Sequence, residues 1–319
     1  KAMHKSLGNG VDPADVFNEN GADILRLWAA SADYHADVRC SKEIFKQLSQ
    51  NYLKFRNTCK FMLDNLVDFD PENLVKPEEM PKLDRWLLTK LNELIEKAEQ
   101  SYCDYEFHII THAVNDFCVT TLSSFYLDIV KDRLYCDGAD SLSRRSAQTA
   151  LYLTLHTLSK LFAPILAFTC DEIWLAMPHT GEDDARNVVL NEMNKPFTAY
   201  ALTAEEMANW EKLAEVRTVV NGVLEAARVE KKIGKSLEAD VHLTVPAEDA
   251  FLANVDGKEL ADLLIVSQVE VTVGDSVKAS AEEAAGTKCP RCWKHSTAAN
   301  AEGLCPRCAE VMRSFPDLA

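Results

Sequence analysis

Residues 84–103 of the chain read DRWLLTKLNELIEKAEQSYC, residues 119–130 read VTTLSSFYLDIV, and residues 151–165 read LYLTLHTLSKLFAPI. In each segment apolar residues recur at steps of three and four, which places them along one face of a helix. The three apolar stripes are Trp86, Leu87, Leu91, Leu94, Ile95 and Ala98; Val119, Leu122, Phe125, Tyr126, Ile129 and Val130; and Leu151, Leu155, Leu158, Phe162 and Ile165. Three amphipathic helices can bury such stripes only against one another, so this stretch predicts a helical bundle on which the rest of the chain is organised.

The composition is that of an ordinary soluble protein with two or more domains. The chain has 319 residues, of which 47% are hydrophobic and 26% charged. No run approaches the roughly 18 consecutive apolar residues of a membrane span, so we expect no membrane partner. The net charge of −16 argues against binding nucleic acid through the overall field, but leaves a local basic patch open. Residues 1–5 resemble neither a start nor a signal peptide, and we expect a fragment of a longer protein.

The ten cysteines fall into two groups. Six stand singly in helical sequence, and we expect buried free thiols in a reducing cytosol: Cys40, Cys59, Cys103, Cys118, Cys136 and Cys170. The other four form two CxxC knuckles, Cys289 with Cys292 and Cys305 with Cys308. Four thiolates at this spacing suit tetrahedral zinc on a two-stranded ribbon, and about thirty residues could not build a core without such a staple. We predict one structural zinc ion held by all four cysteines, over a disulfide pair or a redox CxxC.

Basic and aromatic residues surround the two knuckles. The basic ones are Lys288, Arg291, Lys294, Arg307 and Arg313, and we expect the arginines among them to be available for nucleic-acid phosphates. Trp293 follows the second cysteine directly. Its ring suits stacking on a base and packing against the ribbon equally well, and both interpretations stay open.

A second basic cluster lies at the C-terminal end of the helix predicted over residues 205–232. It consists of Arg228, Lys231, Lys232 and Lys235. These cations could contact phosphates, or they could complement the dipole at the end of the helix, and the two interpretations are equally favoured. The sequence Gly-Lys-Ser at 234–236 is not a phosphate loop, because Val229 stands where that motif requires glycine.

Residues 240–273 alternate between two periodicities. Val241, Leu243 and Val245 alternate as in a strand, residues 260–264 are helical, and alternation returns from Val269 onward. This predicts a small α+β module. Within the bundle, His108 and His112 stand four residues apart, but we predict no metal site there, because no third ligand accompanies them.

Several of these motifs resemble one family. Lys5-Ser6-Leu7-Gly8-Asn9, followed by residues 21–28, resembles the second signature of class I aminoacyl-tRNA synthetases. Residues 128–135, 162–174 and 217–239 are similar to the bundle and following segment of bacterial-type isoleucyl-tRNA synthetases, and the four-cysteine cluster resembles their C-terminal zinc module. The resemblance implies a Lys-Met-Ser-Lys-Ser loop in which Lys5 binds ATP phosphates and Lys5 and Ser6 take part in catalysis. Ala2 and His4 depart from that loop, so its charge would rest on Lys5.

The resemblance also implies a mainly α fold in four parts. Residues 1–60 would end the catalytic domain, 61–204 would form the anticodon-binding helical bundle, 205–285 a basic helix with the small α+β module, and 286–319 the zinc-binding module. The chain would be the C-terminal, tRNA-recognising portion of a cytoplasmic, monomeric isoleucine–tRNA ligase, inactive alone. Its partner would be the anticodon side of isoleucine tRNA, whereas ATP, Mg²⁺ and isoleucine would need the missing N-terminal part.

Other classes of protein remain open. The chain could be a stand-alone nucleic-acid-binding zinc module, or an acidic protein-interaction scaffold in which the zinc is only structural. A DNA glycosylase, whose zinc module is similar, is disfavoured because its N-terminal proline nucleophile is missing. The candidate tRNA contacts are Arg228, Lys231, Lys232, Lys235 and Trp293.

Overall fold

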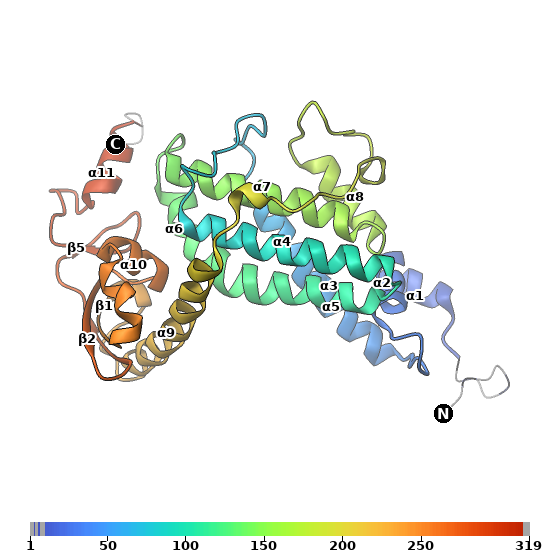
Figure 1. The fold of residues 1–319 in the computed structure, drawn as a ribbon, viewed down its shortest axis with the longest axis horizontal. Coiled ribbons are helices and arrows are strands. Elements are labelled where there is room, and N and C mark those ends of the chain that lie inside the picture. Colours follow the sequence, from blue (N-terminus) through green and yellow to red (C-terminus); the bar gives the residue numbers. More distant parts are fainter. Residues whose placement is uncertain (1–2, 4–5, 7–9, 315–319) are drawn as a thin grey trace. The chain divides into compact units, whose positions relative to one another are not determined.

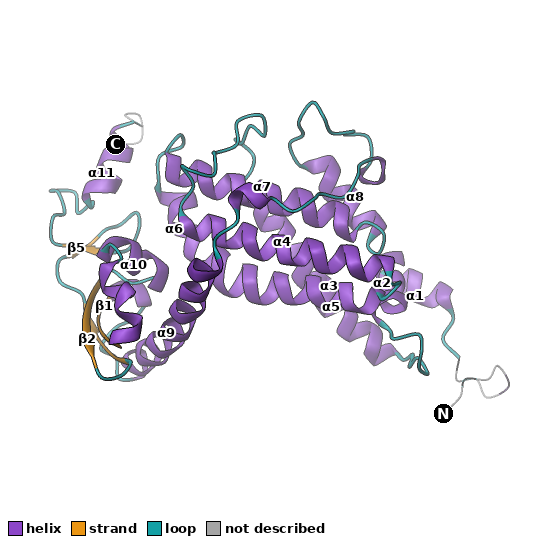
Figure 2. Ribbon diagram, viewed as in Figure 1, coloured by secondary structure: helices purple, strands orange, loops and turns teal. Residues whose placement is uncertain are grey.

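The computed structural model describes residue 3, residue 6 and residues 10–314. The chain forms two compact units, Lys1–Asp128 with Arg145–Ala201, and Ile129–Arg144 with Leu202–Ala319. The chain is mainly helical, and its strands gather in the second unit (Figures 1 and 2). The mainly α fold is therefore confirmed, while the division into four parts stays a prediction.

The helices of the first unit follow one another closely along the chain. They are α1 (Pro13–Asn20), α2 (Ala22–Ser31), α3 (Lys42–Asp64), α4 (Lys82–Cys103), α5 (Phe107–Asp116), the π-helix η2 (Phe117–Tyr126), α8 (Ala167–Ala176) and the short 3₁₀ turns η3 (Val188–Leu190) and η4 (Thr198–Tyr200). Two more helices, α6 (Leu127–Cys136) and α7 (Leu142–Phe162), contribute residues to both units.

The predicted apolar stripes form the core of this bundle. Leu87, Leu91, Leu122, Leu151, Leu155 and Leu158 have no exposed surface. Trp86 is half-buried and packs on Phe125 with 4.7 Å between the ring centroids. Most residues of these stripes on α4, η2 and α7 are buried, and the Tyr102 hydroxyl of α4 donates to the Leu161 carbonyl of α7 at 2.9 Å. The predicted bundle is confirmed.

The middle stripe departs from the predicted periodicity. Residues 117–126 form a π-helix, in which a turn holds more residues than in an α-helix. The Ser124 hydroxyl donates to the carbonyl of Val119, five residues earlier, at 2.7 Å. The wider turn rotates Cys118 into the core at 1% exposure and leaves Val119 only half-buried.

Two charged residues of α2 bind the start of α8. Buried Asp23 accepts from the Thr169 amide at 2.8 Å and from its hydroxyl at 2.6 Å. Arg26 donates to the carbonyls of Pro164 and Ile165 at 2.6 and 2.9 Å. An anion at a helix N-terminus satisfies amides that have no partner within the helix, so Asp23 caps α8 from a distant part of the sequence.

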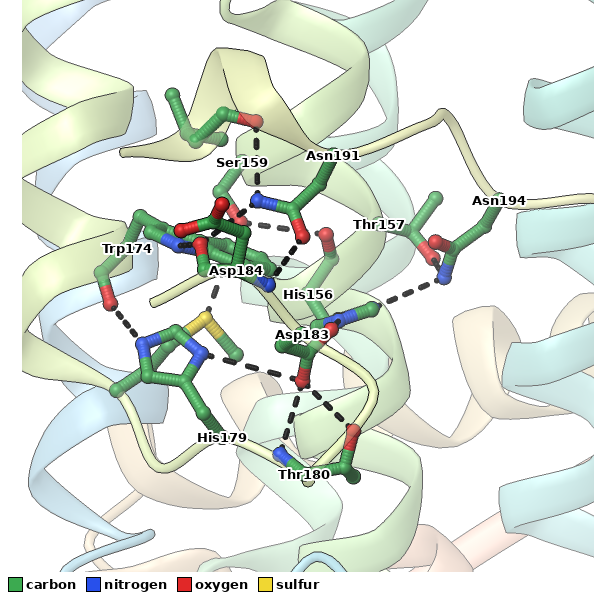
Figure 3. Close-up of polar contacts among 12 residues, drawn as sticks. His156, Thr157, Ser159, Trp174, His179, Thr180, Asp183, Asp184, Asn191 and Asn194 are labelled. Atoms are coloured by element: carbon green, nitrogen blue, oxygen red, sulfur yellow. Dashed lines mark hydrogen bonds and ion pairs between the residues drawn. The ribbon is translucent and has the colours of Figure 1, made fainter. Parts of the chain in front are cut away.

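A polar network holds the long loop of residues 177–197 against α7 and α8 (Figure 3). His156 on α7 donates from Nε2 to Asp183 Oδ1 at 2.9 Å and accepts from Asn194 Nδ2 at 3.1 Å. Asp183 also accepts from the amide of Thr180, and the indole of Trp174 donates to the carbonyl of Asp184. The loop is thus fixed by hydrogen bonds rather than by regular secondary structure.

The second unit is built on α9 (Ala204–Val229) and a three-stranded sheet. The sheet comprises β1 (Ala239–Pro246), β2 (Gln268–Gly274) and β3 (Lys278–Glu283) in the order β2-β1-β3. The crossover from β1 to the parallel strand β2 contains η6 (Ala247–Asn254) and α10 (Gly257–Leu264), whereas β3 is antiparallel to β1. This confirms the predicted small α+β module. The short turn η5 (Ser236–Glu238) precedes β1, and β4 (Thr287–Lys288), β5 (His295–Ser296) and α11 (Pro306–Arg313) follow β3.

None of the helices in residues 10–314 is both long enough and apolar enough to cross a membrane.

Candidate metal centre and nucleic-acid interface

The four cysteines of the two knuckles converge on one point. Their sulfur atoms all lie within 4.8 Å of one another, and those of Cys292 and Cys305 are 3.7 Å apart. Four thiolates at about 2.3 Å from a tetrahedral zinc ion lie about 3.8 Å apart, so the separation fits that ion. Cys289 and Cys308 have no exposed surface, and no cysteine of the described residues forms a disulfide.

Tight backbone turns position the sulfur atoms. The amide of Trp293 donates to the carbonyl of Cys289, and the amide of Cys289 donates to the carbonyl of Lys294. Trp293 has φ 65°, in the left-handed region. The predicted two-stranded ribbon is present, because β4 pairs antiparallel with β5. Pro306 begins α11 directly after Cys305, so the second knuckle opens a helix.

The surroundings of the Cys289 thiol favour its ionised form. Burial opposes a charge on Cys289, but amides of Cys292, Cys305 and Arg291 point toward its sulfur and lower its pKa to about 6. Hydrogen bonds to the ionised form stabilise it. Metal binding requires thiolates, which this environment favours at Cys289. Burial raises the pKa of the Cys292 and Cys308 thiols, so a bound metal ion would have to stabilise their ionised forms.

Four of the five basic residues around the knuckles are engaged inside the chain, whereas Arg313 is exposed. For Arg291 and Arg307 this contradicts the prediction that the arginines are available for phosphates. Arg307 forms a two-pronged ion pair with Asp132 at 2.6 and 2.8 Å and a further one with Asp137 at 3.1 Å. Lys288 pairs with Glu238 at 2.5 Å, and Lys294 pairs with Asp262. These partners lie 32 to 175 residues away in sequence, where local motif analysis cannot find them.

Arg291 and Arg307 join the zinc module to the C-terminal end of α6. Arg291 donates to the carbonyls of Tyr135 and Cys136, which end that helix. Cys136 is 7% exposed and packs against the zinc cysteines. Guanidinium groups on the last carbonyls of a helix complement its dipole, so this contact is complementary in charge.

The predicted basic segment begins in the last turn of α9 and lies on the surface. Arg228 pairs with Glu225 at 2.5 Å, and Lys232 pairs with Glu230 at 2.8 Å, in both cases with exposed side chains. Ile233 is buried and attaches the segment to the core. The amides of Gly234 and Lys235 donate to Glu238, so the backbone donors of a phosphate loop are occupied by a carboxylate. The rejection of a phosphate loop is consistent with this geometry.

Two of the candidate nucleic-acid contacts meet in space. The ammonium group of Lys235 lies 4.5 Å from the centre of the Trp293 ring, within range of a cation–π interaction. Trp293 is 51% exposed, so part of its ring faces solvent. Lys231, with φ 59°, is exposed in the turn between Arg228 and Lys235. Trp293 thus stands beside the basic segment, a proximity that the sequence does not reveal.

Most of the predicted catalytic loop lies outside the described residues, including Ala2, His4 and Lys5. Ser6 of that loop is described and is exposed.

Among the described residues, the histidine pair of the bundle does not form a metal site with a third residue. His108 lies 3.3 Å from Glu106, and residues 10–314 contain no three-ligand group around either His108 or His112. A second group that the sequence did not reveal, Asp240 with His242 and Glu282, has its donor atoms within 4.8 Å of one another.

The fold and the four-thiol site define a class of protein, which comparison with family models identifies. Residues 84–243, half of the chain, match the anticodon-binding domain of tRNA ligase; residues 1–41 match class I tRNA synthetases (I, L, M and V); and residues 286–311 match the zinc finger found in FPG and IleRS. The chain belongs to the family of anticodon-binding domains of tRNA ligases.

Its curated relatives are isoleucine–tRNA ligases. The chain is 44% identical over 335 residues to that of Moorella thermoacetica, covering 99% of this chain and 36% of that protein. It is 45% identical over 328 residues to that of Syntrophotalea carbinolica, covering 98% and 35%. The chain spans about a third of the length of these curated relatives, and its four-cysteine cluster forms one structural zinc site.

Among solved structures, the chain aligns with the LeuRS of a ternary LeuRS–tRNA–LeuAMS complex from Agrobacterium radiobacter. The TM-score is 0.49 at 14% identity, over 86% of this chain and 31% of that one. A likeness of this size does not bear on function.

Proposed function

We propose that this chain is the C-terminal portion of an isoleucine–tRNA ligase and recognises the anticodon side of isoleucine tRNA. The whole ligase would join isoleucine to its tRNA at the expense of ATP. In that setting Lys5 would bind ATP phosphates beside Ser6, with Mg²⁺ as the accompanying cation. The chain alone would not aminoacylate, and it would act as a cytoplasmic monomer.

The observation that carries the proposal is the surface made by Trp293 and the basic segment of Arg228, Lys231, Lys232 and Lys235. It places a half-exposed aromatic ring beside exposed cations. Stacking of a base on an aromatic side chain is worth about 1–3 kcal/mol, and lysines beside it can contact the adjoining phosphates. The overall charge of −16 makes such a local patch the favoured place for an RNA to bind.

The test is a titration of the zinc-loaded chain with isoleucine tRNA, with valine tRNA as competitor, from low to moderate salt. Affinity should fall steeply with salt, and isoleucine tRNA should bind preferentially. Trp293→Ala should weaken binding about 5-fold to 150-fold, as expected from one lost stacking contact, whereas Trp293→Phe should largely preserve it. Lys231→Ala should weaken binding to both tRNAs and reduce the dependence of log affinity on log salt by about 0.9.

Lys278→Ala is a matched control, because Lys278 is an exposed lysine on β3, outside the basic segment. It should bind tRNA like the parent chain. Binding that is absent, or equal for the two tRNAs, would contradict anticodon recognition by this portion and leave the acidic scaffold as the better interpretation. Binding lost equally in Lys278→Ala and Lys231→Ala would show only a general effect of charge.

A further inference from the structure

The exposed face of the three-stranded sheet carries an unusual set of side chains. Along β1, Val241, Leu243 and Val245 are buried, so the alternating residues Asp240 and His242 point to the other face. Pairing places Glu270 of β2 beside His242, and Glu282 of β3 opposite Asp240. One imidazole and three carboxylates therefore share a single face.

The imidazole lies at the centre of this group. His242 Nε2 is 3.4 Å from Glu282 Oε1, and His242 Nδ1 is 3.4 Å from Glu270 Oε2. Donor atoms of Asp240, His242 and Glu282 all lie within 4.8 Å of one another. The three residues come from neighbouring, hydrogen-bonded strands, so the backbone fixes their spacing.

Apart from His242, the carboxylates of this group have no basic partner among residues 10–314. Across residues 10–314, neither lysine nor arginine forms an ion pair with Asp240, Glu270 or Glu282. Like charges directly opposite one another in a sheet are destabilising, as in the pair of Asp240 and Glu282. Either a proton on His242 or a bound cation would relieve this repulsion.

We propose that Asp240, His242 and Glu282 bind a divalent transition-metal ion of the zinc class, separate from the four-cysteine site. Two donors at about 2.1 Å from a tetrahedral ion lie about 3.4 Å apart, which is the distance observed between His242 and Glu282. The imidazole nitrogen selects zinc-class ions over Mg²⁺ and Ca²⁺, which take oxygen ligands. Three protein ligands leave one position for water, and the exposed side chains make the site accessible from solvent.

The test uses the full chain with its four cysteines already filled by zinc and the excess metal removed. Titration with Co²⁺ at pH 7.5 should show a further equivalent whose spectrum lacks thiolate-to-metal charge transfer, because its ligands are nitrogen and oxygen. Calorimetry with Zn²⁺ should show the same stoichiometry. Binding should release a proton wherever His242 was protonated, so the affinity should fall at pH 6.

Three variants decide the assignment. His242→Ala and Glu282→Gln should each weaken the additional equivalent at least about tenfold while the zinc content of the cysteine site stays at one. Glu283→Gln removes the same charge one residue along β3, where the pleat turns the side chain toward the opposite face. It should bind like the parent chain. The proposal is overturned if no additional ion binds at millimolar concentrations, or if His242→Ala binds it unchanged.

Discussion

At the scale of single residues, Gly286 has a conformation that its position requires. Its φ is 98°, in the left-handed region, and an added Cβ would overlap the backbone of Ser296. Gly286 directly precedes β4, so this backbone contact closes the ribbon that carries the first knuckle.

We therefore expect Gly286→Ala to cost about 1–3 kcal/mol in the folded zinc module, since a strained backbone residue costs that much. Zinc affinity, measured by competition with a chromophoric chelator, should fall about 5-fold to 150-fold. Gly222→Ala is the control, because Gly222 lies within α9 with open space around the position that a Cβ would take. It should leave zinc affinity unchanged and stabilise the helix by up to about 1 kcal/mol.

Asp23 is a second residue whose role depends on distant partners. Replacing it by Ala would leave the Thr169 amide without its acceptor, and the Thr169 hydroxyl with Tyr52 alone as its acceptor. A hydrogen bond to a charged group contributes about 1.5–3 kcal/mol, and we expect a loss of that order in the free energy of unfolding of the first unit. Urea denaturation measures it, with exposed Asp15→Ala of α1 as the control. Equal stability of the two variants would contradict the capping role of Asp23.

At the scale of elements, we expect the contact of α11 with the end of α6 to protect the Cys136 thiol from chemical reagents. Arg307→Lys removes the planar group that binds Asp132 and Asp137, while the cysteine ligands stay in place. Cys136, now 7% exposed, should become accessible to a thiol reagent. The zinc-loaded variant should show one more reactive thiol than the parent chain.

Arg313→Lys, an exposed arginine at the end of the same helix, is the control and should add none. If Arg307→Lys also adds none, the ion pairs with Asp132 and Asp137 do not hold the zinc module on α6.

The network around His156 predicts a dependence on pH. Burial, with neighbouring Lys160 and His179, lowers the pKa of His156 below 6.5 although Asp183 opposes this. The unfolded chain therefore binds a proton near pH 6.5 that the folded chain does not, so stability is complete above pH 6.5 and decreases as the pH falls below it. Burial is the largest single influence on Asp183 and opposes its ionisation. The hydrogen bonds from His156 and Thr180 together outweigh burial and keep the pKa of Asp183 below 3.8, which adds a second loss of stability in stronger acid.

Hydrogen exchange of residues 178–194, expressed as protection factors that correct for intrinsic rates, checks this prediction. Protection should decrease between pH 7 and pH 5.5 in the parent chain and change much less in His156→Gln, whose protection is lower throughout. His35→Gln, an exposed histidine with a side chain 61% exposed, should behave like the parent. An identical pH profile in His156→Gln would exclude His156 as the titrating group.

The sequence predicts elements well where a local signal exists. The apolar stripes of residues 84–165 predict the bundle, and the alternation around Val241 predicts β1. The π-helix η2 was not predicted, because a search for steps of three and four residues assumes α-helical geometry. Asp23, which caps α8, lies 146 residues before its partner Thr169 in the sequence, so no local sequence rule predicts this contact.

At the scale of the whole molecule, zinc should stabilise one region only. The zinc module consists of β4, β5 and α11, short elements gathered on four thiols, whereas the bundle has its own apolar core. Removing zinc with a strong chelator at neutral pH should unfold residues 287–313 and leave the helices of the first unit folded. Far-ultraviolet circular dichroism should change little, while hydrogen exchange of residues 287–313 should become fast. Global unfolding on chelation would contradict this independence.

The functional site was predictable only where a local sequence pattern determines the geometry. Spacing alone identifies the four cysteines, since two CxxC turns present paired thiols wherever they occur. Spacing does not show that Arg291 and Arg307 are bound within the chain, because their partners belong to a distant helix. Nor does it show that Lys235 covers Trp293, or that strands β1 and β3 bring Asp240 beside Glu282. Local sequence motifs therefore identify the metal ligands, whereas only the tertiary contacts show which charged side chains remain available to bind a partner.

The exposed ring of Trp293 gives the protein a built-in optical reporter. Of the five tryptophans, Trp174 and Trp210 are buried at 0 and 8% exposure, Trp28 and Trp86 are half-buried, and Trp293 is 51% exposed. Excitation at the red edge of the absorption band selects the indole in the most polar surroundings, which is Trp293. Stacking of a base would quench that emission, whereas loss of zinc would shift its wavelength with the changed environment. A single unlabelled sample can therefore report occupancy of the proposed RNA surface and integrity of the metal centre as two separate optical signals.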